Sequence, residues 1–379
     1  LSRLARIAAA GKTGIPFENI SIVATHSHTG PLYFGALREH FHRAAVAEHG
    51  KDPHEKVDYS VWAAEKIAEA IGRAKQAARP VRLRYGIATE KRLSFNRRFH
   101  MKKGGVRFNP GQLNPGIVRV AGPIDPDAGI IELLSGGGVP LASLVVFALH
   151  LDTVGGTDYS ADYPRYLSEG LQAAFGKEYI SFFGAGTCGD INHIDVKVKG
   201  RRTAREIGSL LAETVRGGIP GLSAVTEPSL AVLRATVDVP LQRYSGREID
   251  RARDEMKLVG SRKLSFLAQV KAYKIMALEL REASTLALEV QVFRISSELA
   301  IVTLPGEVFV ELGLAIKRGS PFRNTLVIEL ANDAPGYIPT RKAFTEGSYE
   351  TVNSRVQSGG GEAMVKAALR LLKELRQGI

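Results

Sequence analysis

Cysteine is nearly absent from this sequence, since Cys188 is the single one among 379 residues. One cysteine excludes an intramolecular disulfide and a cysteine-rich zinc site. Long hydrophobic runs are missing as well, because no apolar stretch approaches the roughly 20 residues that a membrane-spanning helix needs. With 44% hydrophobic and 24% charged residues, the chain otherwise has the composition of a globular protein. We therefore expect a sizeable core and no transmembrane segment.

The sequence also lacks a basic stretch interleaved with aromatic residues, the pattern that single-strand nucleic-acid binders use. Its net charge of +12 comes from Lys and Arg residues that are scattered and often lie beside acids, as in residues 247–257. This distribution predicts a generally basic surface and no nucleic-acid partner. Peripheral contact with an anionic membrane is compatible with the charge, and no residue pattern specifies an oligomeric state.

Helical and strand patterns alternate along the chain, which predicts one α/β domain with a mixed β-sheet, helices packed on its faces and an active site at strand ends. The segments 130–134 and 141–149 are expected to pair antiparallel across a glycine-rich reversal. The expected strands are 20–24, 81–88, 130–134, 141–149, 179–183, 285–294, 299–304 and 325–330. The expected helices are 57–78, 163–175, 204–216, 246–280 and 361–376.

Capping-box patterns mark the starts of two of these helices, at Thr203-x-x-Glu206 and Ser245-x-x-Glu248. The second opens the long basic helix expected over 246–280, outside the core.

Two segments show no regular period. Residues 91–126 are rich in Gly, Pro, Asn and Arg and predict an irregular loop of the kind that borders active sites. The second segment contains histidines at irregular spacing, which favours a solvated excursion over a metal site. These histidines are His40, His42, His49 and His54.

The functional signal is that several strands end in residues suited to metal binding or catalysis. The apolar run that opens ISIVATHSHTGP, residues 20–31, leads to His26 and His28, which an extended chain would project on one side. Other expected strands end close to His150, the Asp190–His193 stretch, Glu307 and Tyr337. Because ligands in α/β sheets commonly bind at the carboxyl ends of strands, these residues are expected to share one cleft.

Two histidines and one carboxylate, with a position left for water, form a catalytic zinc arrangement. Each residue also has a structural interpretation. The His-x-His pair suits a turn, His150 a hydrogen-bonded core histidine, and Glu307 an acid at a helix N-terminus. The zinc hypothesis therefore depends on their convergence.

The order of six motifs resembles the catalytic domain of the neutral/alkaline non-lysosomal ceramidase family. The motifs are THSHTGP at 25–31, Asn96-Arg97, the strand ending at His150, GTCGDINH at 186–193, Leu-Pro-Gly-Glu at 304–307, and Ala-Asn-x-x-x-x-Tyr at 331–337 with Ser-Tyr-Glu at 348–350. The resemblance covers nearly the whole chain and is weak between the motifs.

This resemblance implies a zinc-dependent amidohydrolase that cleaves the amide bond of an N-acylsphingosine or related N-acyl lipid by metal-activated water. It also implies a secreted or periplasmic location. The residues implied to hold Zn2+ are His26, His150, Glu307 and Tyr337. Those implied to surround the scissile group are Arg97 and Tyr349, as donors to the oxyanion, and His28, as a proton shuttle to the leaving amine.

The chain departs from the family pattern in two ways. In GDINH, Asn192 and His193 stand where the family has Ser and Pro, and we expect both to contact substrate, with His193 also close enough to join the metal ligands. We expect no counterpart of the family's C-terminal immunoglobulin-like domain, because the sequence stops after the helix expected near 376, and residues 1–16 read as the end of an amphipathic helix and not as a signal peptide. We therefore expect a shortened member whose N-terminal beginning is missing, so that residues 1–379 form a single ceramidase-like domain.

Three alternatives follow from the same residues. The first is a metallohydrolase acting on a different amide or ester. The second is a cysteine hydrolase that uses Cys188, flanked by glycine and near His193. The third is a non-catalytic relative that binds lipid or carbohydrate.

Overall fold

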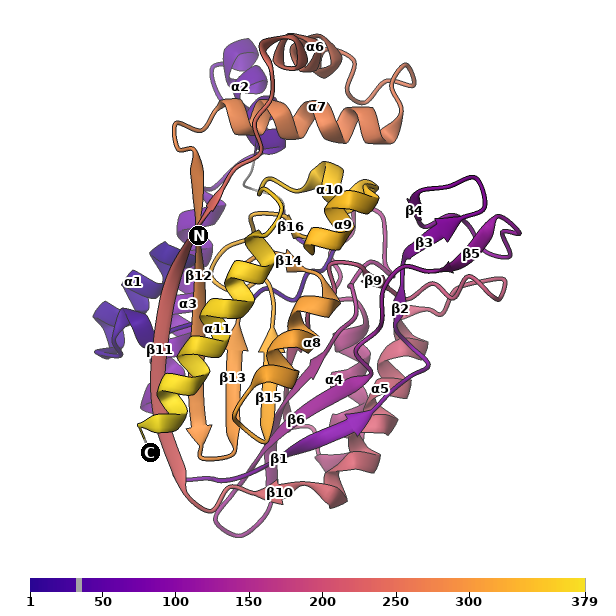
Figure 1. The fold of residues 1–379 in the computed structure, drawn as a ribbon. Helices are drawn as coiled ribbons and strands as arrows, with labels where there is room; N and C mark the ends of the chain where they lie inside the picture. The colour runs from indigo at the N-terminus through magenta and orange to yellow at the C-terminus, as the bar shows by residue number, and fades with distance from the viewer. Residues whose placement is uncertain (32–35, 379) are drawn as a thin grey trace.

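Two mixed β-sheets form the centre of the protein in this computed structural model, which describes residues 1–31 and 36–378 (Figure 1). Each sheet has one parallel pair of strands beside antiparallel neighbours. In sheet order, the first consists of β10 (Ser223–Ala224), β1 (Arg82–Thr89), β6 (Asp127–Leu134), β7 (Pro140–Phe147) and β8 (Ile180–Ala185). The second consists of β11 (Pro228–Pro240), β12 (Thr285–Ser296), β13 (Leu299–Thr303) and β15 (Asn324–Ile328).

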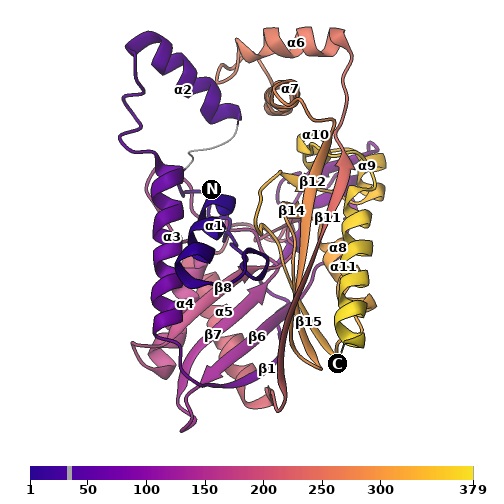
Figure 2. The same ribbon diagram turned by 90° about the vertical axis from the view of Figure 1, so that its left-hand side faces the viewer.

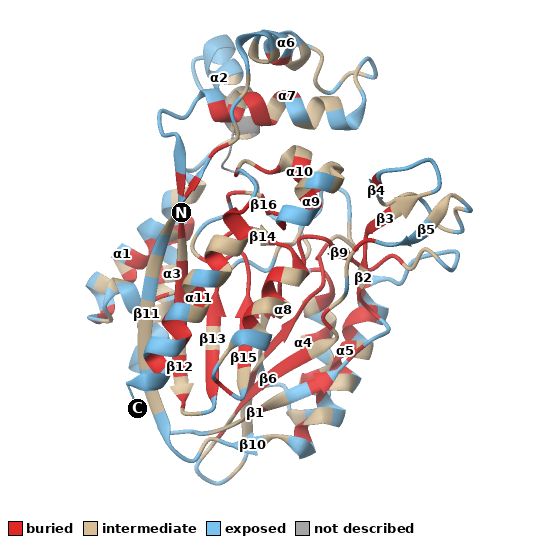
Figure 3. Ribbon diagram, in the orientation of Figure 1, coloured by how far each residue is buried: buried red, intermediate tan, exposed pale blue. Residues whose placement is uncertain are grey.

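The sheets pack face to face because buried apolar residues alternate along their strands. In β6, Ile131 belongs to the core between the sheets, while its neighbour Ile130 faces the helices on the outer side. In β15, Leu326 belongs to the core between the sheets, and Val327 faces the helices on the outer side of the second sheet. Figure 3 shows these central strands as the most buried part of the molecule.

Helices cover both outer faces and give four layers. The helices α4 (Tyr163–Phe175) and α5 (Ala204–Gly218) cover the first sheet, and α8 (Val310–Gly319) and α11 (Gly360–Gln377) cover the second. The helices α1 (Ser2–Thr13) and α3 (Tyr59–Gln76) pack against each other outside these layers (Figure 2). Within the described ranges, no helix is both long and apolar enough to cross a bilayer.

The remaining elements are short or lie at one end of the sheets. They are the helices α2 (Ala36–His49), α6 (Gly246–Met256), α7 (Phe266–Glu279), α9 (Arg341–Glu346) and α10 (Tyr349–Asn353), the 3-10 turns Phe17–Asn19 and Ile219–Gly221, and the strands β2 (Phe95–Asn96), β3 (Arg98–Met101), β4 (Val106–Phe108), β5 (Ile117–Val120), β9 (Ile191–Asn192), β14 (Glu307–Val308) and β16 (Tyr337–Ile338).

The α/β class with mixed sheets and helices on their faces is confirmed. The antiparallel pairing of β6 with β7 and both capping boxes are also as predicted. The central strands divide, however, into two packed sheets and not one, and other short strands of the described residues form three smaller sheets.

Three local predictions were wrong. The helix expected over 246–280 is two helices, because Gly260 adopts a left-handed φ of 83° and the Ser265 side chain caps a new helix start at the Ala268 N–H. The segment 91–126 is not irregular, since β3, β4 and β5 form a small sheet there. The strand expected over 20–24 is reduced to an isolated bridge between Val23 and Ala331.

The histidine-rich segment is also more ordered than predicted. Its first part forms α2, and the His42 Nδ1 lies 3.0 Å from the Asp52 Oδ2. The side chain of His40 lies outside the described residues.

Candidate metal and active site

Three separate segments bring metal-binding side chains to one point. His26 and His28 follow the bridge at Val23, His150 follows β7, and Glu307 begins β14. The Glu307 Oε2 lies 3.7 Å from the His26 Nε2 and 3.5 Å from the His150 Nε2. One ring nitrogen of each of the three histidines lies within 4.8 Å of the others. The predicted convergence of His26, His28, His150 and Glu307 is therefore present in the structure.

The positions of His26 and Glu307 depend on two residues with left-handed backbone and on the close approach of two backbone segments. His26 has a φ of 72°, so the chain turns there and does not continue as the extended strand that was expected to align His26 with His28. Gly306 has a φ of 79°, and a Cβ there would lie 2.7 Å from the Gly336 carbonyl oxygen. This close approach allows β14 and β16 to pair in parallel, which places Glu307 opposite Tyr337.

A hydrogen bond orients the buried imidazole of His150. Its Nδ1 lies 2.9 Å from the Cys188 carbonyl oxygen, which can only accept, so Nδ1 carries the proton and Nε2 is a free lone pair. Among the described residues, the His150 Nε2, the His26 Nδ1 and the Glu307 Oε2 are buried without a hydrogen-bond partner. Unpartnered buried polar atoms are costly, and a cation bound between the His150 Nε2 and the Glu307 Oε2 would satisfy both. This donor set therefore fits a metal ion.

The protonation states also fit a metal ion. Burial lowers the pKa of His26 to about 3, and the neighbouring His150 contributes to the shift. Burial alone would raise the pKa of Glu307, but His26 and His150 hold it at about 2. At neutral pH His26 is therefore a neutral imidazole and Glu307 an ionised carboxylate, the forms that coordinate metals.

Tyr337, Arg97 and Tyr349 lie together on the Glu307 side of the site. The rings of Tyr337 and Tyr349 are 5.4 Å apart between centroids, and the Arg97 Cζ lies 5.4 Å from the Tyr337 centroid. Burial raises the pKa of Tyr337 well above its ordinary value, and Glu307 adds to the shift. Arg97 is fixed, since its Nε donates to the Glu350 Oε1 at 3.0 Å and its Nη2 to the Gly189 carbonyl at 2.7 Å.

Asn192 and His193 are both buried, and their polar atoms contact other protein groups. The Asn192 Nδ2 donates to the Asn109 Oδ1 at 2.8 Å, and its Oδ1 accepts from the Ile194 N–H at 3.0 Å. The His193 Nδ1 lies 2.9 Å from the Asp152 Oδ1. Their assignment as substrate contacts stays a prediction.

Two acidic residues near the site were missed. Asp152 lies two residues after His150 and faces His193, a spacing that was visible in the HLDT stretch. Glu329 is buried after β15, and its Oε2 accepts from the backbone N–H groups of Cys188, at 3.1 Å, and Val308, at 2.7 Å. Glu329 thereby links two segments: the one whose Cys188 carbonyl orients His150, and the strand β14, which carries Glu307. In the sequence, the one indication of Glu329 was its place at the end of the apolar run LVIE.

Cys188 does not have the surroundings of a nucleophile. Its buried Sγ donates to the Glu329 Oε1 at 3.0 Å, and burial, with Glu329 contributing, raises the pKa of the thiol well above its ordinary value. Reactive cysteines have lowered pKa values and exposed sulfur. We therefore expect iodoacetamide to leave the native intact mass unchanged and to label Cys188 only after denaturation. Native labelling that abolishes hydrolysis would favour the cysteine-hydrolase alternative.

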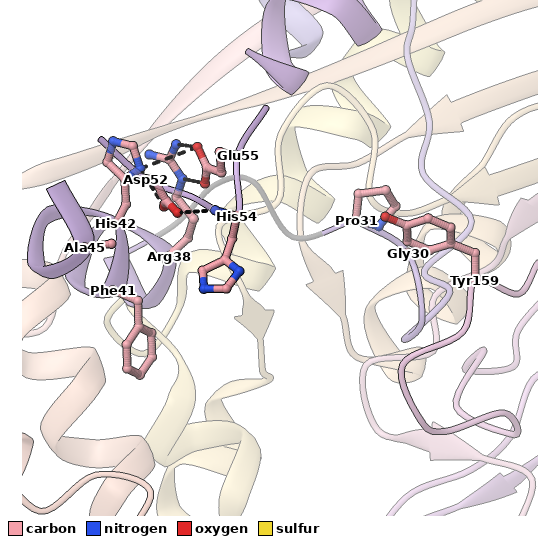
Figure 4. A pocket seen from close by; sticks show the side chains of 10 residues that line it. All are labelled: Gly30, Pro31, Arg38, Phe41, His42, Ala45, Asp52, His54, Glu55 and Tyr159. Atoms are coloured by element: carbon pink, nitrogen blue, oxygen red, sulfur yellow. Dashed lines mark hydrogen bonds and ion pairs between the residues drawn. The ribbon is translucent and has the colours of Figure 1, made fainter. Parts of the chain in front are cut away.

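A second group of metal-type side chains lies away from this centre, at α2. The ligand atoms of His42, Asp52 and Glu55 are within 4.8 Å of one another, and they border a cavity of about 500 Å3 with Tyr159 on its opposite wall (Figure 4). The Arg38 Nε, however, donates to the Glu55 Oε1 at 2.7 Å. Because a guanidinium already neutralises Glu55, this group is an ion-pair cluster and a weaker candidate for a cation.

The fold is similar to that of two solved ceramidase structures. The neutral ceramidase from Pseudomonas aeruginosa superimposes with a TM-score of 0.71 and 17% identity, over all of this chain and 65% of that one. A ceramidase complexed with C2 gives a TM-score of 0.69 and 16% identity, over all of this chain and 66% of that one. This chain thus spans slightly less than two thirds of the length of either structure. No family model and no curated protein sequence matches it. Together with the geometry above, these likenesses establish that the chain has a ceramidase-like fold.

Proposed function

We propose that this protein is a zinc-dependent hydrolase that cleaves the amide bond of an N-acylsphingosine or a related N-acyl lipid. The observation that carries the proposal is the convergence of His26, His150 and Glu307, in which the unpartnered Glu307 Oε2 lies 3.5 Å from the unpartnered His150 Nε2 and 3.7 Å from the His26 Nε2. The likeness to solved ceramidases supports the N-acyl lipid as substrate.

The metal would be held by His26, His150, Glu307 and Tyr337. When bound, zinc supplies a Lewis acid for the amide carbonyl and lowers the pKa of a coordinated water to about 7. His28 provides a further imidazole within the same cluster, so metal content of His28→Ala protein distinguishes a ligand from a proton-transfer group.

The other residues act on the scissile amide. Arg97 is held by Glu350 and Gly189 and lies against the Tyr337 ring, so a rigid positive charge beside the proposed ligand Tyr337 would stabilise the oxyanion. Tyr349 keeps its proton because burial raises the pKa of its phenol, which suits a hydrogen-bond donor. His28 is the exposed member of the histidine cluster, the position that a proton shuttle to the leaving amine requires.

The proposal is tested by metal analysis combined with a hydrolysis screen. Protein purified without chelator should contain stoichiometric zinc and release fatty acid from ceramide, and chelation should abolish this activity until zinc is restored. A protein without stoichiometric transition metal, or with chelator-resistant hydrolysis, would contradict the metal mechanism.

The same screen addresses a second candidate, a metallohydrolase for a different amide or ester. The motif GDINH favours it, because Asn192 and His193 replace residues of the ceramidase pattern. N-acyl amino acids and simple esters should therefore be included. Chelator-sensitive activity confined to them would keep the metal mechanism and reject the ceramide assignment.

A further inference from the structure

The connection between β11 and β12 forms a helical hairpin, residues 241–284, that contains α6 and α7. Figures 1 and 2 show α7 lying over α10 at the end of the sheets where the candidate site is found. The first residue of α7, Phe266, is 60% exposed. A large apolar side chain thus stays uncovered at the site end of the hairpin.

Phe266 touches the site through Tyr349. Its ring is stacked on the Tyr349 ring with 5.5 Å between centroids and 29° between planes. Phe108, from β4, lies 4.7 Å from the same tyrosine ring, and Tyr349 in turn lies 5.4 Å from Tyr337. Two separate segments of the chain, β4 and the start of α7, therefore place aromatic rings against Tyr349, which lies next to the proposed metal ligand Tyr337.

The hairpin is anchored to the segment that carries Tyr349. At its base, the Gln242 Nε2 donates to the backbone carbonyls of Ser354, at 2.9 Å, and Val356, at 3.2 Å. The buried Lys274 of α7 donates from its Nζ to the Gln242 Oε1 at 3.0 Å. These bonds hold α7 in place over α10, so the contact between Phe266 and Tyr349 is a fixed feature of the fold.

We propose that Phe266 is a specificity-determining residue: with Phe108 and Tyr349 it forms an aromatic wall that receives the hydrocarbon chain of the N-acyl substrate. This inference rests on the proposed function and adds to it the element that selects chain length. The wall is apolar and continuous with the group that holds the metal. A flexible hydrocarbon chain next to the scissile amide would cover the exposed face of Phe266 and gain hydrophobic free energy.

The test compares Phe266→Ala with Leu280→Ala, which removes another exposed apolar side chain, 61% exposed, at the opposite end of α7. Acetyl, octanoyl and palmitoyl amides of one amine are assayed in detergent micelles and in vesicles. Phe266→Ala should lower kcat/KM for the palmitoyl amide about tenfold, mainly through KM, and leave the acetyl amide unchanged. Leu280→Ala should match wild type, and Phe266→Tyr should restore the preference for long chains.

Equal losses at every chain length would overturn the proposal, as would a loss confined to vesicle-embedded substrate, which would make Phe266 a membrane contact. Calorimetric binding of dodecanoate gives a readout independent of turnover. If wild-type protein hydrolyses no N-acyl amide, the proposed function has failed, and about tenfold weaker dodecanoate binding by Phe266→Ala would still support the aromatic wall. Equal binding by both proteins would reject it.

Discussion

Under the proposed metal mechanism, His150→Ala protein should lose zinc and hydrolytic activity together. His150 is fully buried, and its Nε2 is directed at Glu307 while Nδ1 is held by the Cys188 carbonyl. Changing a residue that only orients a ligand costs about 10–100-fold in metal affinity, so removing the ligand itself should cost at least about a hundredfold. Zinc content and hydrolysis after dialysis measure the two losses.

Two further variants make this result specific. Glu307→Gln keeps the side-chain volume, so it should fold normally and still lose zinc because the anionic ligand is gone. His49→Ala removes an exposed histidine that pairs only weakly, at 3.8 Å, with Glu48, and it should keep wild-type zinc and activity. If His150→Ala and Glu307→Gln retained stoichiometric zinc while folded, the metal would be bound elsewhere, and the cluster at His42 would be examined next.

That His26, His150 and Glu307 would lie close together was predictable from sequence, because each of them follows an apolar run. His150 comes directly after an apolar strand, and Tyr337 is recognisable from its motif at the end of another. Such runs carry no information about the backbone conformation of the segments between them. The left-handed turn at His26 depends on pairing with the segment after β15, some 300 residues away in sequence, and no local pattern reports it.

The fold was predictable to a similar extent and for similar reasons. Amphipathic helices such as α4 bury one face, so their spacing shows in the sequence. The strand β11 was missed, because this edge strand is largely exposed and mixes polar with apolar residues. The supporting role of Glu329 was missed too, since a buried acid is recognised by the two N–H groups it accepts from, and these come from distant segments.

Glu350→Ala should be the most destabilising of the substitutions considered for this protein. The Glu350 carboxylate is fully buried and accepts from the Arg97 Nε at 3.0 Å and from the Arg98 Nη1 at 2.8 Å. Removing it leaves the buried Arg97 guanidinium without its ion-pair partner, which costs about 3–5 kcal/mol. The free energy of unfolding, from denaturant titration at neutral pH, measures this cost.

Glu374→Ala is the matched control, because Glu374 also pairs with an arginine, Arg370 at 2.7 Å, but both side chains are largely exposed. An exposed pair contributes about 0–1 kcal/mol, so the two variants separate burial from pairing. Adding Arg97→Met to Glu350→Ala should recover part of the lost stability, since it removes the charge that Glu350 no longer compensates, whereas Arg98 still has Glu346, whose Oε2 lies 3.2 Å from the Arg98 Nη2. A Glu350→Ala cost as small as that of Glu374→Ala would show that water reaches these arginines. In that case Arg97 would not be held in a dry site, and its proposed role as an oxyanion donor would lose the rigid positioning on which it depends.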